Sequence, residues 1–332
     1  MSLRLARPAL AVLASVFTLA AIVQTPLIAQ DRIAVQAAPA GAVHHINTVF
    51  VIVMENHNWT GNGSLSIKKN PAAPYINYTL IPMASHAENY RNPPGIHPSL
   101  PNYLWLEGGT NFGVTNDGPP SQNHQSTNVH LVDLLQSAGI SWKAYEENIS
   151  GTNCPVVNSG PIDANGSPLY AVKHDPFVYF DDVTNNRNPN WAPCIAHIRP
   201  FTELARDLAA NKVARYNFIT PNLCDDMHDG CGGDPIAHGD AWLKANVPAI
   251  LNSTAYRSGG ALFIVWDEGA VGDGPIPMLV LSPFAKGNGY ASGGYFTHCS
   301  MLRTFQEIFG VYPLIRYASA LPDLKDLFAV FP

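Results

Sequence analysis

Charged side chains are scarce in this 332-residue chain: only 13% of its residues are Asp, Glu, Lys or Arg, whereas 46% are hydrophobic. Acids outnumber bases by 25 to 19, which gives a formal net charge of −6. An acidic chain has no general electrostatic attraction for nucleic acid or for an anionic membrane surface. We therefore expect neither of them as a partner. The composition instead favours a large buried core under a surface of neutral polar residues.

Cysteine is also rare, and no two of the five cysteines have the CxxC spacing of a thiolate zinc site. A G-x-S-x-G serine elbow, an H-E-x-x-H zinc helix and a G-x-x-x-x-G-K-[ST] phosphate loop are absent as well. In an exported protein, five cysteines suggest two disulfides and one free thiol. Cys224 and Cys231 are close enough to close a loop, and Cys154 and Cys194 could bracket the segment between them. Cys299 would then be the free thiol.

The N-terminus has the pattern of a secretory signal peptide. Arg4 and Arg7 precede an apolar run from about residue 9 to residue 23, which is too short for a comfortable membrane span. We predict a signal peptide at 1–30 and a flexible leader at 31–46, with an uncleaved anchor as the alternative. Removal of the signal would change the net charge from −6 to −8. The predicted location is secreted or periplasmic, without stable membrane insertion.

Apolar runs and helical periodicities alternate along the rest of the chain. Strands are expected at Thr48–Asn56, Ile140–Tyr145, Arg215–Thr220, Ala261–Glu268 and Pro277–Ser282. Helices are expected at Leu100–Leu106, Thr127–Ser137, Phe201–Ala210, Asp240–Leu251 and His298–Phe309. This alternation predicts an α/β fold with a mostly parallel central sheet and helices on both faces. Residues 47–332 are predicted to form a single domain, with loop insertions near 57–96 and 148–200.

Two of the expected strands end in acidic or amide side chains. TVFVIVM is followed by Glu55 and Asn56, and ALFIVW by Asp267 and Glu268. If the two strands are neighbours, three carboxylates gather at one edge of the sheet, where they would repel one another unless a cation lies between them. The simplest alternative is two strands that end in polar turns. We predict one divalent metal ion, whose identity the sequence does not reveal.

Ser99 precedes a short amphipathic helix and is expected to be its N-cap. A serine at a helix N-terminus is also well placed for a nucleophile that meets a phosphate group. The remaining candidates for chemistry are His174, Asp226, His228 and His298. A hydroxyl, acids and histidines around one cation suit phosphoryl transfer. The alternative for each histidine is a hydrogen-bonded loop residue. No role is predicted for His57, His86, His97, His124 and His130, and Asp225 and Asp229 are expected in a solvated turn.

Six short motifs in a fixed order resemble the phosphoesterase family of acid phosphatases and phospholipases C, within the alkaline-phosphatase-like superfamily. They are MENH at 54–57, HPSLPN at 97–102, KHDP at 173–176, DMHD at 226–229, WDEG at 266–269 and HCSMLR at 298–303. The resemblance spans about residues 47–310. It implies an alkaline-phosphatase-like fold.

The resemblance also implies roles for individual residues. The implied metal ligands are Glu55, Asn56, Asp267 and Glu268, with the nucleophile Ser99 within reach of the metal. The implied catalytic residues are Ser99, His174 and His228, and the implied substrate-binding residues are Asn102, His174, His228 and His298. The chain has ENHNW after its first strand where the phospholipases have ENRSF, which favours the phosphatase branch.

The predicted function is a secreted, metal-dependent phosphomonoesterase that forms a phosphoserine at Ser99. Its expected partner is a small phosphate ester, with a phospholipid head group as one candidate. The chain ends soon after the expected catalytic domain, which also favours the phosphatase. The alternatives are a phospholipase C-type phosphodiesterase and a catalytically silent, exported metal-binding protein. If His174 or His228 binds phosphate as an imidazolium, activity should fall as the pH rises through its pKa.

Overall fold

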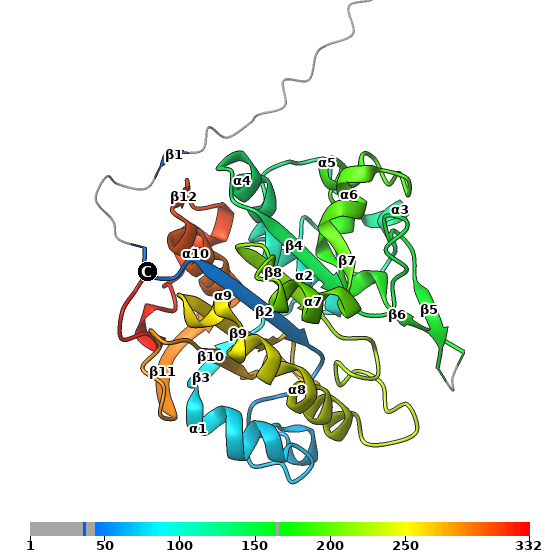
Figure 1. Cartoon of the computed structure of the whole chain (residues 1–332). Coiled ribbons are helices and arrows are strands. Elements are labelled where there is room, and N and C mark those ends of the chain that lie inside the picture. Colours follow the sequence, from blue (N-terminus) through cyan, green and yellow to red (C-terminus); the bar gives the residue numbers. More distant parts are fainter. Residues whose placement is uncertain (1–35, 38–43, 164–165) are drawn as a thin grey trace, which may run out of the picture. The chain divides into compact units, whose positions relative to one another are not determined.

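The computed structural model of the chain describes residues 36–37, 44–163 and 166–332 (Figure 1). The predicted signal peptide at 1–30 and most of the predicted leader lie outside these residues, so both stay predictions. Among the described residues, no helix combines the length and the apolar character that a membrane span requires.

An eight-stranded sheet forms the centre of the fold, in the order β11-β3-β10-β9-β2-β8-β4-β7. Within this sheet only β10 runs against the other strands, which confirms the mostly parallel sheet. In the same order, the strands are Tyr290–Thr297, Ser85–Arg91, Met278–Leu281, Gly260–Trp266, Thr48–Met54, Tyr216–Thr220, Trp142–Glu146 and Ile198–Pro200. Two small two-stranded sheets pair β1 (Gln36–Ala37) with β12 (Val311–Tyr312) and β5 (Ser159–Ile162) with β6 (Pro168–Tyr170).

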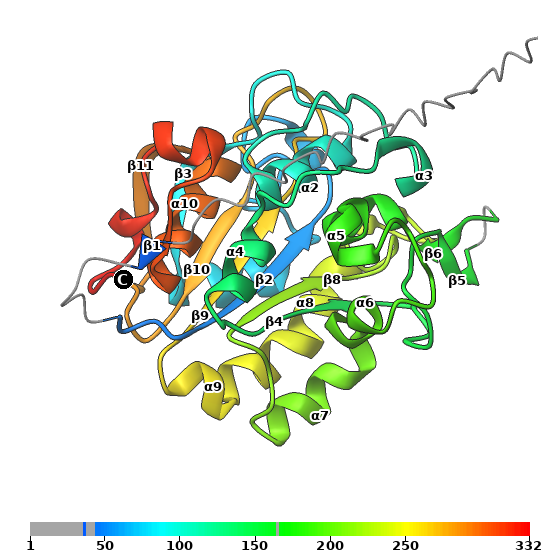
Figure 2. The same ribbon diagram turned by 90° about the horizontal axis from the view of Figure 1, so that it is seen from above.

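Helices cover both faces of the sheet, as predicted. Figure 2 shows α2, α4 and α10 on one face and α7, α8 and α9 on the other. These helices are, in chain order, Ser99–Gly108, Leu131–Ser137, Leu204–Ala209, Pro235–Asn252, Thr254–Arg257 and His298–Phe309. The remaining α-helices are α1 (Ile81–Met83), α3 (Pro120–Asn123), α5 (Asp181–Thr184) and α6 (Ala192–His197). Because helices pack on both faces, β2 and β9 are buried along their whole length, which explains their uninterrupted apolar runs.

The predicted loop insertions contain more regular structure than expected. Strand β3 lies inside 57–96, strand β7 lies inside 148–200, and β11 was missed as well. The sequence SHAENYR of β3 mixes polar and apolar residues, and β11 contains a glycine pair and a register shift. These features weaken the strand pattern, because glycine and charged residues have low β-propensity. The strands form because neighbouring strands supply their hydrogen bonds.

Helix α8 begins five residues before the predicted start at Asp240. Asp234 caps it, since its Oδ1 accepts hydrogen bonds from the backbone N–H groups of Ile236 at 2.9 Å and Ala237 at 3.4 Å. Pro235 occupies the first helical position, where its missing N–H costs nothing. An Asp-Pro pair at this point was the sequence signal for the true start.

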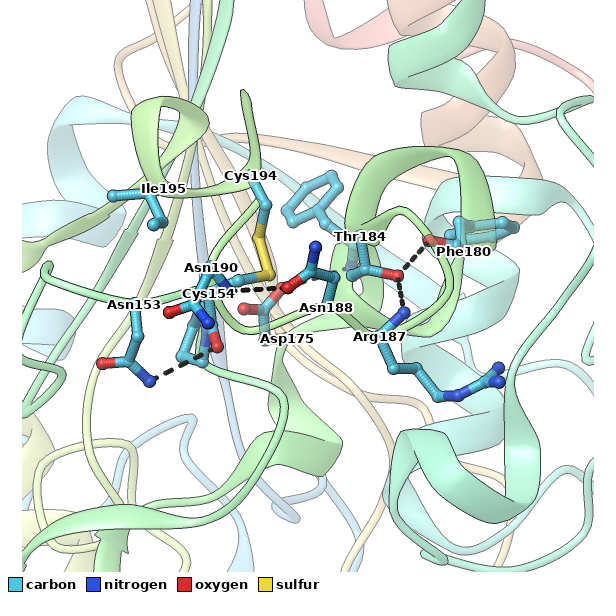
Figure 3. The surroundings of a disulfide bond; sticks show 12 residues. Asn153, Cys154, Asp175, Phe180, Thr184, Arg187, Asn188, Asn190, Cys194 and Ile195 are labelled. Carbon is cyan, nitrogen blue, oxygen red and sulfur yellow. Dashed lines mark hydrogen bonds between the residues drawn. A yellow bond between two sulfur atoms is a disulfide. The ribbon is translucent and has the colours of Figure 1, made fainter. Parts of the chain in front are cut away.

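Both expected disulfides are confirmed. Cys154 and Cys194 are bonded across 40 residues, and Cys224 and Cys231 across seven. Figure 3 shows the first bond among residues of the segment that it brackets, where the Cys154 N–H donates to the Pro189 carbonyl at 2.7 Å. Cys299 is the free cysteine and is buried.

A buried histidine joins helix α2 to the start of α4. His130 Nδ1 lies 3.0 Å from Glu107 Oε1, its Nε2 lies 3.0 Å from Asp182 Oδ2, and its ring stacks on Phe180. Burial alone would lower the pKa of His130, but the hydrogen bonds to Asp182 and Glu107 raise it to about 9. Burial raises the pKa of Glu107, which affects stability on the acid side.

We expect His130→Gln to destabilise the protein by about 3–5 kcal/mol below neutrality, because it leaves Glu107 buried without its cation. The contribution of His130 is complete below its ordinary pKa of about 6.5 and is lost as the pH rises through about 9, since the folded pKa is the higher one. Urea unfolding of both proteins between about pH 6 and about pH 10 measures this loss. His124→Gln is the control, because His124 and Asp181 form a more exposed pair. If the difference in unfolding free energy between wild type and His130→Gln stays constant with pH, His130 is not charged in the folded protein.

Candidate active site

The two acid-ended strands lie side by side. Strands β2 and β9 pair in parallel with Met54 opposite Trp266, and the Asp267 N–H donates to the Met54 carbonyl at 3.0 Å. Glu55 and Asp267 therefore leave the sheet at the same level, and both are fully buried. This is the carboxyl edge of the parallel strands, where open α/β sheets bind their ligands.

The side chain of Asn56 links the two carboxylates. Its terminal amide has one atom 2.8 Å from Glu55 Oε2 and 3.0 Å from Asp267 Oδ1, and its backbone N–H donates to Asp267 Oδ1 at 3.2 Å. Two arrangements satisfy this geometry. Either the amide nitrogen donates to both carboxylates, or the amide oxygen faces them with a cation among the three. Asn56 has a left-handed backbone (φ 43°), which directs its side chain back toward the strand ends.

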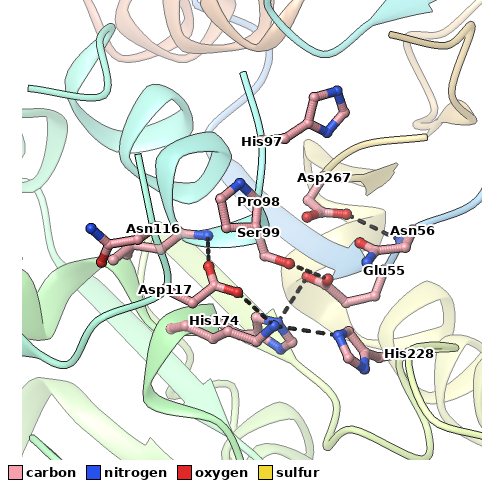
Figure 4. Close-up of polar contacts among 12 residues, drawn as sticks. Glu55, Asn56, His97, Pro98, Ser99, Asn116, Asp117, His174, His228 and Asp267 are labelled. Carbon is pink, nitrogen blue, oxygen red and sulfur yellow. Dashed lines mark hydrogen bonds and ion pairs between the residues drawn. The ribbon is translucent and has the colours of Figure 1, made fainter. Parts of the chain in front are cut away.

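Helix α2 brings a hydroxyl group to this cluster. Ser99 Oγ donates to Glu55 Oε2 at 2.9 Å (Figure 4), and Tyr103 Oη donates to Glu55 Oε1 at 2.6 Å. The two residues are four apart, so they lie on the same face of the helix. Both are buried, and together they fix the Glu55 carboxylate.

The prediction that Ser99 is the N-cap of this helix is wrong. Ser99 is the first helical residue, Pro98 is the N-cap, and no side chain of the cap residue bonds to the helix. Asp117 satisfies one of the free N–H groups instead, since its Oδ1 accepts from the Leu100 N–H at 2.9 Å. Because the Ser99 hydroxyl is not used as a cap, it is free to point at Glu55.

His174 and His228 lie beside Glu55, and each has a carboxylate next to its Nδ1. His174 Nδ1 is 3.2 Å from Asp226 Oδ2, and His228 Nδ1 is 2.7 Å from Asp229 Oδ1. Ligand atoms of Glu55, His174 and His228 all lie within 4.8 Å of one another. A histidine whose other nitrogen faces a carboxylate is the usual arrangement in metal sites. Asp229, expected in a solvated turn, is therefore part of the site, and so is Asp226.

The disulfide Cys224–Cys231 closes the loop that carries Asp226, His228 and Asp229. Inside it, Asp226 Oδ1 accepts from the His228 N–H at 2.7 Å, and the Glu55 N–H donates to the Asp226 carbonyl at 2.8 Å. The loop is thus fixed to the end of β2, and it places His228 near the nucleophile candidate.

Burial and mutual repulsion raise the pKa of the acids. Burial, with Asp267 and Asp226 nearby, raises the pKa of Glu55 well above its usual value. Burial raises the pKa of Asp267 to about 6, and burial with the Asp267 charge raises that of Glu268 to about 9. Such groups resist ionisation until a cation neutralises them.

The residues present fit a divalent cation. The buried Nε2 of His174 has no hydrogen-bond partner, although Glu55 Oε1 is 3.3 Å away. This unpartnered nitrogen lies beside the convergent oxygens of Glu55, Asn56 and Asp267, which are of metal-ligand type. Burial, with Lys173 and His228 nearby, lowers the pKa of His174 well below its usual value. His174 is therefore expected to act as a neutral ring, in contrast to the imidazolium role considered for it.

The other predicted site residues lie behind this cluster. Asn102 Nδ2 donates to Glu268 Oε2 at 2.9 Å and to the Ile96 carbonyl at 3.0 Å. His298 Nε2 donates to the Asp267 carbonyl at 2.6 Å, and its Nδ1 accepts from Tyr90 Oη at 3.0 Å. We therefore expect both Asn102 and His298 to position the acids and not to touch substrate.

Glu268 is turned away from Glu55 toward a histidine that the sequence left without a role. Its Oε2 lies 2.5 Å from His97 Nδ1, whose Nε2 is 3.0 Å from Asp273 Oδ1. Glu268 thus has protein partners, whereas Asn56 and Asp267 face Glu55. Its predicted role as a metal ligand stays a prediction.

Sequence reasoning missed four residues near the site: Tyr103, Asp117, Lys173 and His97. Tyr103 could have been found from its spacing of one helical turn after Ser99. Lys173 and His97 stand inside the motifs quoted above, although no role was derived for them. Asp117 lies in an irregular segment and carries no sequence signal.

A cavity of about 560 Å³ opens beside the site. Its lining includes Asp117, Lys173 and His228 together with the apolar residues Val157, Val172 and Leu223. Polar groups at one end and apolar walls elsewhere suit an organic group joined to a charged one.

The mostly parallel sheet with helices on both faces has the alkaline-phosphatase-like α/β fold. The family model described as "Phosphoesterase family" matches residues 91–312, more than half of the chain, and the chain belongs to this family. The chain is a hydrolase acting on phosphoric ester bonds, as the resemblance implied.

Relatives of known activity support this class. The chain is 28% identical over 292 residues to phosphatidylinositol-3-phosphatase of Mycobacterium tuberculosis, covering 87% of this chain and 85% of the relative. It is 32% identical over 173 residues to an acid phosphatase of Aspergillus fumigatus, covering 52% and 36%. Phospholipase C A of Mycobacterium tuberculosis is 24% identical over 262 residues, covering 64% and 46%. The chain thus spans less than half of the length of the last two.

Solved structures confirm the fold. A protein of the alkaline phosphatase superfamily from Vibrio parahaemolyticus has a TM-score of 0.54 at 12% identity, covering 88% of this chain and 74% of that one. Human ectonucleotide pyrophosphatase/phosphodiesterase 5 has a TM-score of 0.52 at 10% identity, covering 85% and 100%. At these identities, the likeness is one of fold alone.

Proposed function

We propose that the chain is a secreted, metal-dependent phosphomonoesterase in which Ser99 is the nucleophile. The observation that carries the proposal is the hydrogen bond from the Ser99 hydroxyl to Glu55 at 2.9 Å, at the N-terminus of helix α2. An N-terminal helix turn favours an anion, so a phosphate group bound there would meet the hydroxyl oxygen. The single domain predicted for residues 47–332 would supply all of these groups.

Ser99 Oγ would form a bond to phosphorus while the bond to the alcohol of the substrate breaks. A water molecule would then cleave the serine ester, releasing inorganic phosphate and restoring the hydroxyl. One divalent cation, held by Glu55, Asn56 and Asp267, would lower the pKa of the hydroxyl when bound. His174 and His228 line the other side of Glu55, beside the place where the phosphate would bind.

A single cation agrees with the position of Lys173. Its Nζ lies 3.3 Å from His228 Nε2, the nitrogen that a second cation would need. An ammonium group donates into this lone pair and repels a metal ion at the same place. We therefore place the ion among the oxygens of Glu55, Asn56 and Asp267 and not in the Glu55–His174–His228 triad.

Two names among the relatives bear on the substrate. The mycobacterial relative with the longest reported match is named a phosphatidylinositol-3-phosphatase, and another is named a phospholipase C. The first acts on a phosphate monoester, and it is matched over nearly its whole length. We therefore favour a monoester, with a phosphorylated lipid head group as one candidate, over a phospholipase C-type diester. Both disulfides fit an oxidising compartment, and N-terminal sequencing of exported protein would test secretion.

The proposal predicts that the mature protein hydrolyses p-nitrophenyl phosphate at least about tenfold faster, by kcat/KM, than p-nitrophenylphosphorylcholine. Both reactions release the same chromophore, so their ratio compares monoester and diester directly. A preference for the choline diester would replace the monoesterase with the phospholipase C-type activity. If protein loaded with Mg²⁺, Mn²⁺, Ca²⁺ or Zn²⁺ hydrolyses neither substrate, the result counts against both the monoesterase and the phospholipase C-type activity.

A further inference from the structure

Lys173 supplies a positive charge in the middle of the acid-rich site. Its Nζ donates to Asp117 Oδ2 at 3.0 Å and lies 3.3 Å from His228 Nε2. The side chain is 18% exposed, so it is held in place but remains open to solvent on one side.

Asp117 fixes the ammonium relative to the nucleophile. Its Oδ1 accepts from the Leu100 N–H at 2.9 Å, next to Ser99, while its Oδ2 accepts from Lys173. One carboxylate therefore ties the cation to the first turn of helix α2. This connection fixes the position of the ammonium group relative to the helix turn that carries Ser99.

The third N–H of the ammonium group is left for a ligand. An ammonium group has three donors, and two of them face Asp117 and His228. Lys173, Asp117 and His228 all line the 560 Å³ cavity beside the site. A phosphate group that reaches Ser99 from this cavity would pass within reach of the remaining donor.

The negative charges around the site make the Lys173 ammonium group important for the choice of substrate. Lys173 is next to His174, whose ring lies 3.3 Å from Glu55 and 3.2 Å from Asp226, both of them buried acids. An incoming anion must overcome these negative charges. A phosphate monoester carries two negative charges near neutral pH and a diester only one, so the monoester depends more strongly on each cation in the site.

We propose that Lys173, anchored by Asp117, contacts a non-bridging oxygen of the substrate phosphate and selects dianionic phosphate monoesters over diesters. The proposal rests on the function proposed above and assigns its specificity to this pair. Asp117 is a positioning residue, and Lys173 is the group that touches substrate.

The test compares p-nitrophenyl phosphate with bis(p-nitrophenyl) phosphate in Lys173→Met, Lys173→Arg and Asp117→Asn. Lys173→Met should lower kcat/KM for the monoester by roughly a hundredfold or more, as loss of one charged donor does. The diester should lose less, so that the monoester-to-diester ratio falls at least about tenfold. Lys173→Arg keeps the charge and should retain most of the ratio. Asp117→Asn should give an intermediate loss.

A second readout does not need turnover. Calorimetric binding of inorganic phosphate to the metal-loaded protein should weaken at least about tenfold in Lys173→Met, with metal content and melting temperature unchanged. Lys143→Met is the matched control, because Lys143 pairs with Asp207 at 2.8 Å and has a similar exposure of 21%. It should alter neither the ratio nor phosphate binding.

Equal losses for both substrates with unchanged phosphate binding would overturn the proposal and leave Lys173 a structural residue. Failure of the proposed function has a different signature. In that case the wild type hydrolyses neither ester, or Ser99→Ala remains active. The phosphate-binding comparison still decides the role of Lys173 then, because it is independent of turnover.

Discussion

Replacement of Ser99 by alanine is expected to lower turnover by roughly three or more orders of magnitude while the protein stays folded. The Ser99 hydroxyl donates to Glu55 and does not cap helix α2. Asp117 accepts the hydrogen bond from the Leu100 N–H at this helix end instead. Removal of the Ser99 hydroxyl therefore deletes the attacking atom but leaves the hydrogen bond from the Leu100 N–H to Asp117 in place. The stability should change by only about 1 kcal/mol, the net value of one hydrogen bond. Hydrolysis of p-nitrophenyl phosphate and urea unfolding measure the two effects separately.

Ser253→Ala is the matched control for this experiment. Ser253 is the N-cap of α9, where its hydroxyl accepts from the Tyr256 N–H at 3.1 Å. Loss of this cap should cost about 1 kcal/mol and leave kcat unchanged. Ser99→Thr preserves a hydroxyl and should retain some turnover. If Ser99→Ala behaves like Ser253→Ala, Ser99 is a structural residue only.

Removal of the divalent cation is expected to abolish activity, and re-addition of one metal ion per chain should restore it. Asp267→Asn and Glu55→Gln each remove one charged ligand and should weaken metal binding and cut turnover by roughly tenfold or more. The matched control is Asp326→Asn, which alters an exposed acid paired with Lys286 and should have no effect on either quantity. Elemental analysis that finds active protein without stoichiometric metal would contradict this prediction.

The same cation should stabilise the fold more at high pH than at low pH. In the metal-free protein the pKa of Asp267 is raised to about 6, above its ordinary value of 3.8. The folded state then holds a proton that the unfolded state releases, so metal-free stability falls as the pH rises from about 4 through about 6. Glu268, with its pKa raised to about 9, extends the loss further. The rise in melting temperature on metal addition should be larger at about pH 7.5 than at about pH 4.5.

The part of the site that lies on strand ends could be predicted from the sequence. Buried parallel strands leave long apolar runs, and the first polar residue after each run marks the edge of the sheet. Glu55, Asn56 and Asp267 were found in this way, and the pairing of β2 with β9 brings them together. Strands β3 and β11 were not predicted, because their polar and glycine residues are tolerated only through pairing with their neighbours.

The part of the site that lies in irregular segments could not be predicted. Asp117 and Lys173 are 56 residues apart and meet only because both segments pack at the start of helix α2. The predicted N-cap role of Ser99 was also wrong, since Asp117, from a distant segment, accepts the Leu100 N–H. Hydrogen bonds between distant residues leave no periodic signal.

The most direct test of a phosphoserine mechanism is acid quenching of the enzyme during turnover, followed by peptide mass spectrometry. The attacking oxygen forms a covalent bond to phosphorus, and a serine phosphate ester survives acid that unfolds the protein. We expect phosphate on the peptide that contains Ser99 and none on that peptide from the Ser99→Ala protein. Phosphate trapped on another residue, or a fully active Ser99→Ala protein without any trapped phosphate, would contradict the role of Ser99 as the nucleophile.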